Sequence, residues 1–169
     1  KNIYVRKFEL KDARIKLVEE SDGELNLLKI FPPSDEPEDT TTSDFPFTIE
    51  VADFSMTNVD FSLQRYDKVG SKENYQSLNT DDLRINDLNV SFNAFADLAK
   101  YTYRLTINNI SFNPNVNFFQ LQHLSGSILL TPQLAGINKL HLITRDSDVE
   151  LSAAILGVDF LEEFSMEQL

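Results

Sequence analysis

Apolar and polar residues alternate with a period of two in two separate stretches of the chain. The apolar positions are 5, 8, 10, 13, 15 and 17 in the first stretch, and 51, 54, 56, 59, 61 and 63 in the second. The two sets differ by a constant 46 positions, so the second stretch repeats the first. A period of two indicates β-strands, because an amphipathic helix would place apolar residues at i, i+3, i+4 and i+7.

The apolar phase slips by one residue twice in each copy, for example between Leu10 and Ala13. A two-residue type I′ turn would place Leu10 opposite Ala13, with Asp12, or Asn58 in the second copy, tolerating a positive φ. A β-bulge would also re-phase the strand while keeping it continuous. Both alternatives predict antiparallel sheet with one apolar face and one polar face.

The rest of the chain predicts more strands, two polar loops and little helix. Residues 34–44 hold five acids and neither a base nor an apolar residue, which predicts a flexible acidic loop. Residues 67–81 predict a second polar loop, and residues 25–31 a short helical or extended plug. In residues 159–169, Asp159 as N-cap and Glu162 three positions later predict a helix. Strands are expected at residues 83–95, 101–112, 118–130 and 139–155, with turns at Asn113-Pro114 and Thr131-Pro132.

These elements together predict a mainly β chain with one or two short helices, one of them C-terminal. We expect a curved antiparallel sheet, or taco-like β-groove, built of repeated strand pairs. The length of 169 residues fits a single β-rich domain over residues 1–169. Because the chain begins with Lys1 and ends in an amphipathic stripe, we expect it to be a fragment of a longer protein.

The amino-acid composition excludes several classes of function. The 15 basic and 27 acidic residues give a net charge of −12. This negative charge repels a phosphate backbone, so we expect no nucleic-acid partner. The chain has no cysteine, which excludes disulfides, Cys-ligated zinc and thiol nucleophiles. No apolar run approaches the roughly 18 residues of a membrane span, and no signal peptide is recognised.

The candidate chemical sites are weak, so we predict no catalytic residue, no metal site and no cofactor. His123 and His141 each lie between strand residues without a second ligand at metal spacing. The acidic loop lacks the alternating oxygen ligands and the turn glycine of a calcium loop. Adjacent carboxylates at 81–82 and 162–163 do not supply the cleft-spanning pair of a glycosidase.

The chain has 13 Phe but no Trp. Ordinary packing of a β core explains this composition. A long apolar sheet face that stays open and holds an apolar ligand explains it as well.

The order of motifs resembles the N-terminal part of AsmA/TamB-type proteins. The resemblance begins with Phe8-x-Leu10-x-Asp12-Ala13 and continues with Asp22-Gly23-Glu24-Leu25-Asn26-Leu27. A variable polar loop and a second strand pair of the same kind follow, ending at Tyr66-Asp67. Two further patterns are similar to the repeating unit of that family. They are residues 119–128, which include Gly126, and then residues 140–149.

The resemblance implies a non-enzymatic segment of a large envelope protein of a Gram-negative cell. Such a protein is anchored in the inner membrane through a part outside this sequence and extends through the periplasm. Its curled sheet shields acyl chains, so phospholipid and an outer-membrane assembly protein are the implied partners. The implied roles are lipid transport between the membranes and outer-membrane biogenesis. The alternative is a closed β-sandwich that serves as a binding or adhesion module. The candidate groove-lining residues are Phe8, Leu10, Phe54, Met56, Ile85, Leu88, Val90, Ile107, Ile110 and Phe112.

Overall fold

The computed structural model describes residues 1–30 and 47–157, which form one open, curved sheet of nine strands. The predicted acidic loop at 34–44 and the predicted helix at 159–169 lie outside the described residues. The N-terminal elements are β1 (Asn2–Val5), β2 (Phe8–Lys11), β3 (Arg14–Glu19) and a single turn of helix, α1 (Asn26–Ile30). The remaining strands are β4 (Thr48–Arg65), β5 (Asp82–Asp97), β6 (Thr102–Pro114), β7 (Leu121–Thr131), β8 (Leu134–Thr144) and β9 (Asp148–Leu156).

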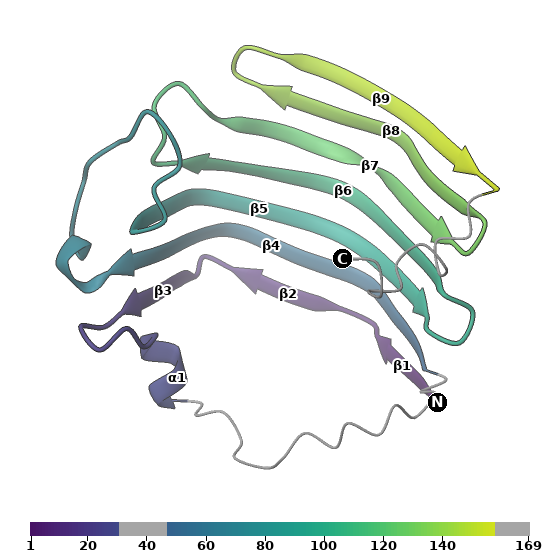
Figure 1. Ribbon diagram of the computed structural model, residues 1–169, viewed down its shortest axis with the longest axis horizontal. Coiled ribbons are helices and arrows are strands. Elements are labelled where there is room, and N and C mark those ends of the chain that lie inside the picture. Colours follow the sequence, from purple (N-terminus) through teal and green to yellow (C-terminus); the bar gives the residue numbers. More distant parts are fainter. Residues whose placement is uncertain (31–46, 158–169) are drawn as a thin grey trace, which may run out of the picture.

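Strands β4 to β9 form an antiparallel meander in which each strand pairs with the next. They lie side by side as a series of arcs, with β9 at one edge of the sheet (Figure 1). The mainly β, curved, groove-like architecture is thereby confirmed. One predicted strand, residues 139–155, is instead the hairpin β8–β9. The chain reverses there because the Thr144 N–H donates to the Ser147 carbonyl and the Thr144 hydroxyl accepts the Asp146 N–H.

The N-terminal edge differs from the expected antiparallel pairing. Strands β1, β2 and β3 follow one another along β4, and all three pair with it in parallel (Figure 1). Val5 lies beside Val51, Phe8 beside Phe54 and Leu17 beside Leu63. The offset of 46 residues between the two sequence copies is therefore the register of this pairing. The apolar pattern could not reveal the direction, because a parallel and an antiparallel partner bury the same alternation of side chains.

The phase slips are β-bulges and not turns. Strand β4 runs without interruption through Asn58, which has φ 54°, and Asp12 has φ 50° between β2 and β3. The Asn58 side-chain amide donates to the Asp12 carboxylate at 2.6 Å. Asp and Asn tolerate the left-handed conformation better than other non-glycine residues. The two equivalent bulges therefore stack side by side.

Bulges continue across the whole sheet. Asp87 in β5 and Lys139 in β8 also have positive φ, and Gly126 in β7 has φ 142°. Every antiparallel strand pair contains at least one register shift. A bulge bends its strand and increases the local twist. The bulges therefore keep the apolar residues in phase on one face while they curve the sheet.

The segment after β3 is held against that strand by an asparagine. Gly23 adopts φ 83° in the turn, and the Asp22 carboxylate accepts the Glu24 N–H. The Asn26 side chain accepts the Val18 N–H at 3.0 Å and donates to the Lys16 carbonyl at 3.3 Å. This amide therefore takes the place of a neighbouring strand at the open edge of β3, and the expected short plug is α1.

The polar segment after β4 is ordered by a buried carboxylate. A 3₁₀ turn, η1 (Tyr66–Lys68), leads into residues 69–81. Asp82, fully buried at the start of β5, accepts hydrogen bonds from Gln64 at 2.8 Å, Tyr75 at 3.0 Å and Arg84 at 3.2 Å. The predicted loop is therefore attached to one end of the sheet.

Candidate functional site: the apolar face of the sheet

The ten predicted lining residues lie on one face of the sheet. Cross-strand partners in register share a face, so two rows of these side chains can be followed from strand to strand. Phe8, Phe54 and Ile107 belong to one row, together with Phe92. Leu10, Met56, Val90 and Ile110 form the next row. Residues Leu88 (beside Val59), Ile85 (beside Phe61) and Phe112 (beside Leu121) continue the same face.

Three phenylalanines stack across the β2–β4–β5 part of this face. The ring centroids of Phe8 and Phe54 are 4.7 Å apart with an interplanar angle of 9°. Those of Phe54 and Phe92 are 4.4 Å apart at 19°. Phe8 at the edge is 44% exposed, so the stack is open to solvent at one end.

No second layer covers this face within the described residues. Their only buried hydrophobic residues are Val59, Ile107 and Leu121. The apolar side chains of β9, such as Leu151 and Ile155, are about half exposed. Two sheets packed face to face would bury both inner faces. The described residues form one open sheet and not the two packed sheets of a sandwich.

An apolar hollow of about 330 Å³ lies on this face near the start of β4. Most of its lining side chains point to the apolar face: Ile49, Val51, Ala94, Ala96, Tyr103, Leu105, Ile128 and Leu130. Apolar hollows of this size are typical of sites for small apolar ligands. Over β4–β7, this hollow therefore lies on the apolar face of the sheet.

None of the residues that line this hollow is among the ten predicted lining residues. Those ten lie around the phase slips, whereas the hollow lies over the regular ends of the strands beyond them. The available signal was the strict alternation of apolar residues at positions 49 and 51, 94 and 96, and 103 and 105. The ten predicted residues and the hollow are continuous along one face, because Val51 and Phe54 are successive apolar-face residues of β4.

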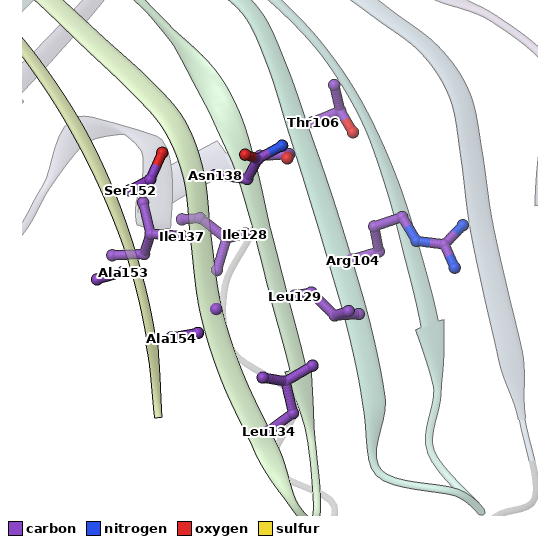
Figure 2. A pocket seen from close by; sticks show the side chains of 12 residues that line it. Arg104, Thr106, Ile128, Leu129, Leu134, Ile137, Asn138, Ser152, Ala153 and Ala154 are labelled. Atoms are coloured by element: carbon purple, nitrogen blue, oxygen red, sulfur yellow. The ribbon is translucent and has the colours of Figure 1, made fainter. Parts of the chain in front are cut away.

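A second hollow, of about 600 Å³, lies over β6–β9 and is lined mostly by residues of the opposite face. Figure 2 shows Thr106, Asn138 and Ser152 at one end of it and Leu134 at the other. Arg104 extends from β6, and its guanidinium lies 5.8 Å from the centre of the Phe95 ring. The lining is mixed, with serine, threonine and asparagine beside leucine and alanine.

The two histidines lie in a polar row of the same opposite face. His123 Nδ1 is 2.8 Å from Asn109 Oδ1, and its Nε2 is 2.9 Å from Ser125 Oγ. His141 Nε2 is 2.7 Å from an Asp148 carboxylate oxygen. A serine–histidine contact is one part of a nucleophilic site, but such a site also needs a cleft for its substrate. Neither of the two hollows described above is lined by His123 or Ser125.

The described part of the chain contains no group of three or more His, Asp or Glu residues arranged to hold a metal ion. It also contains no helix long and apolar enough to cross a membrane.

In comparisons with known proteins, no family model, no curated protein and no solved structure matches this chain.

Proposed function

We propose that this chain is a non-enzymatic, lipid-shielding segment of an AsmA/TamB-like envelope protein. Its open apolar face holds acyl chains against the curved sheet, while the polar face is in contact with water. The parent protein would be anchored in the inner membrane and would act in the periplasm. There it would move phospholipid toward the outer membrane or assist an outer-membrane assembly protein.

The main support for this proposal is the apolar face of the sheet, which the described residues leave uncovered. Bulges keep the apolar side chains in phase over a nine-stranded sheet, and the described residues leave that face uncovered. Large exposed apolar patches on soluble domains mark sites for protein, membrane or ligand. The apolar hollow over β4–β7 favours a flexible hydrocarbon ligand, because its lining is almost entirely aliphatic and aromatic. The motif order along the sequence adds the family resemblance.

The test is a pair of neighbouring substitutions in β6. Leu105 faces the hollow, and Thr106 is next in sequence and faces the opposite side. Leu105→Asp introduces a carboxylate where an acyl chain would lie, and desolvating a charge in apolar surroundings is costly. We expect binding of a fluorescent fatty acid to weaken at least tenfold, which corresponds to about 1.4 kcal/mol. Thr106→Asp adds the same charge on the polar face and should leave binding unchanged.

Native mass spectrometry of the purified chain, with organic extraction, supplies an independent measurement. Phospholipid that is released only on unfolding, together with the loss of uptake in Leu105→Asp alone, would support the proposal. A lipid-free chain that takes up no acyl probe, or equal losses in both variants, would contradict it. Circular dichroism of both variants checks that the sheet is retained.

A further inference from the structure

Apolar side chains protrude into solvent at the end of the sheet where β4 and β6 end. Phe118, in the turn between β6 and β7, is 73% exposed, more than any other aromatic residue that the structure describes. Leu78, in the 69–81 segment, is 65% exposed, and Phe119 is exposed as well. Figure 1 shows this segment and the β6–β7 turn at the same end of the sheet. Leu78, Phe118 and Phe119 are called the apolar tip below.

The turn that carries Phe118 is fixed to the rest of the fold. The side-chain amide of Asn115, which is buried, donates to the Asp82 carbonyl at 2.7 Å. The Asn117 N–H donates to the Tyr75 carbonyl at 2.6 Å and so joins the turn to the segment before β5. Phe118 itself adopts φ 64°, a conformation that bulky residues rarely adopt. The buried polar groups at this end therefore hold a turn that presents a phenylalanine ring to solvent.

The turn carries no charge. Residues 105–138 contain no Lys, Arg, Asp or Glu, although 25% of the whole chain is charged. The N–H groups of Asn117 and Phe119 already have carbonyl acceptors within the protein. Charges and unpaired backbone groups are costly to move from water into the apolar part of a bilayer. The turn can therefore approach that layer without burying a charge.

We propose that the apolar tip inserts into the surface of a phospholipid bilayer with zwitterionic headgroups. Exposed Phe and Leu side chains partition into the boundary between headgroups and acyl chains. A bilayer is fluid and accepts side chains that protrude from separate segments, whereas a protein partner would need a surface of matching shape. Residues 66–81 carry two basic and three acidic side chains. This balance gives no attraction to an anionic membrane, so apolar insertion is the driving force.

The tip lies far from the points where the chain enters and leaves the sheet. The Lys1 carbonyl accepts the Thr48 N–H, and the Gly157 N–H donates to the Gln133 carbonyl in the β7–β8 turn. Both contacts lie at the opposite end of the sheet, about 40 Å away along the 13 residues of β6. Further strands that add to either edge would lie beside the tip and not over it. The tip therefore stays accessible when the sheet is part of a longer one.

The tip is continuous with the apolar face. The ring centroids of Phe119 and Phe112 are 6.4 Å apart, with an interplanar angle of 51°. Phe112 is one of the ten predicted lining residues, so a bilayer at the tip would adjoin the end of that face. Docking goes beyond the proposed lipid-shielding function and does not depend on it, because insertion requires no lipid on the sheet.

Binding of the full chain to phosphatidylcholine vesicles, measured by flotation, tests the proposal. Phe118→Asn removes the ring but suits the backbone, since asparagine tolerates the left-handed conformation. Tyr101→Asn is the matched control, because Tyr101 is also an exposed aromatic residue with positive φ, in the β5–β6 turn at the opposite end. From the apolar area of one phenylalanine, we expect vesicle partition to fall about tenfold in Phe118→Asn and less than about twofold in Tyr101→Asn. Circular dichroism checks that both variants are folded.

Leu105→Asp separates docking from acyl-chain binding. This variant should lose the fatty-acid probe but still bind vesicles, whereas Phe118→Asn should bind the probe as the unsubstituted chain does. Vesicle binding that is lost in Leu105→Asp and kept in Phe118→Asn would overturn the proposal, since the sheet face would then contact the bilayer. Equal partition of Phe118→Asn and Tyr101→Asn would also overturn it. So would an unsubstituted chain that binds no vesicles, or binds only those that contain anionic phosphatidylglycerol.

Discussion

At the scale of single residues, the structure depends on a few positions that adopt the left-handed conformation. Asn58 and Asp12 occupy equivalent bulges in the two sequence copies, and their side chains hydrogen-bond to each other across the parallel strand pair. The Asn58 N–H in turn donates to the Asn89 side chain in β5 at 3.0 Å. One asparagine thus connects three neighbouring strands at the point where the sheet bends.

Two substitutions of Asn58 separate its backbone conformation from its hydrogen bond. Asn58→Ala loses the contact with Asp12 and replaces asparagine by a residue that tolerates positive φ less well, so we expect the free energy of unfolding to fall by about 2 kcal/mol. Asn58→Gly loses the contact but relieves the backbone, and it should cost about 1 kcal/mol less than the alanine variant. Urea denaturation measures both. Equal losses would show that the conformation of residue 58 contributes nothing.

The sequence predicted the place of these bulges but not their nature. The phase slip at Leu10–Ala13 and the tolerance of Asp12 for positive φ were visible in the pattern. A tight turn and a bulge use the same residue types, however, so the local sequence left both open. The partner that distinguishes them is β4, which begins more than 30 residues further along the chain.

At the scale of elements, the β7–β8 pair shows how closely two bulged strands approach. A Cβ on Gly126 would lie 2.7 Å from the Leu140 Cα and 2.9 Å from the Lys139 carbonyl oxygen. Lys139 is itself the bulge residue of β8, with φ 48°. The bulge of one strand therefore packs directly against the glycine of its neighbour.

Alanine substitutions at two glycines test this packing. We expect Gly126→Ala to lower the free energy of unfolding by about 2–3 kcal/mol, because backbone atoms of β8 must move. Gly136→Ala is the matched control in β8, since the nearest atoms to its Cβ would lie 3.9 Å away, which is ordinary contact. It should change stability by less than about 1 kcal/mol. Thermal unfolding that ranks the two variants in the reverse order would contradict this account.

At the scale of the whole molecule, stability comes from a single layer whose strands touch only their neighbours. The sheet is attached at one end to the 69–81 segment through Asp82. Burial disfavours the charged form of this carboxyl, but hydrogen bonds from Gln64 and Tyr75 and the nearby Arg84 charge outweigh it, so the pKa of Asp82 lies below its ordinary value of 3.8. The ionised carboxylate therefore stabilises the folded chain.

The sign of the pH effect follows. Because the pKa of Asp82 is lower in the folded than in the unfolded chain, its contribution is complete above 3.8 and is lost as the pH falls through the folded value. Between about pH 5 and pH 2, the unfolding free energy should fall less steeply in Asp82→Asn than in the unsubstituted chain. At neutral pH the variant should be less stable, by about 2–3 kcal/mol. Asp53→Asn, which removes an exposed carboxylate of β4, is the control and should change the stability at neutral pH by less than about 0.5 kcal/mol.

The fold class could be predicted from the sequence because alternation and β-branched composition are local signals. The parallel edge could not, because the alternation in positions 5–17 is the same whichever way the partner strand runs. The ten predicted residues share one face, but the hollow at Val51, Leu105 and Ile128 depends on how far β4 to β7 curve together, and curvature is the sum of several bulges.

Paired residues of β1–β3 and β4 are 46 positions apart in the sequence. This separation also affects the order in which the strands fold. Each hairpin from β4 to β9 joins residues that are close in sequence, so its chain closure costs little entropy. The parallel edge requires closure across a much longer loop, and such non-local contacts form slowly. The meander can therefore assemble first and present β4 as a template. The N-terminal copy, although it comes first along the chain, is then the last to join the sheet.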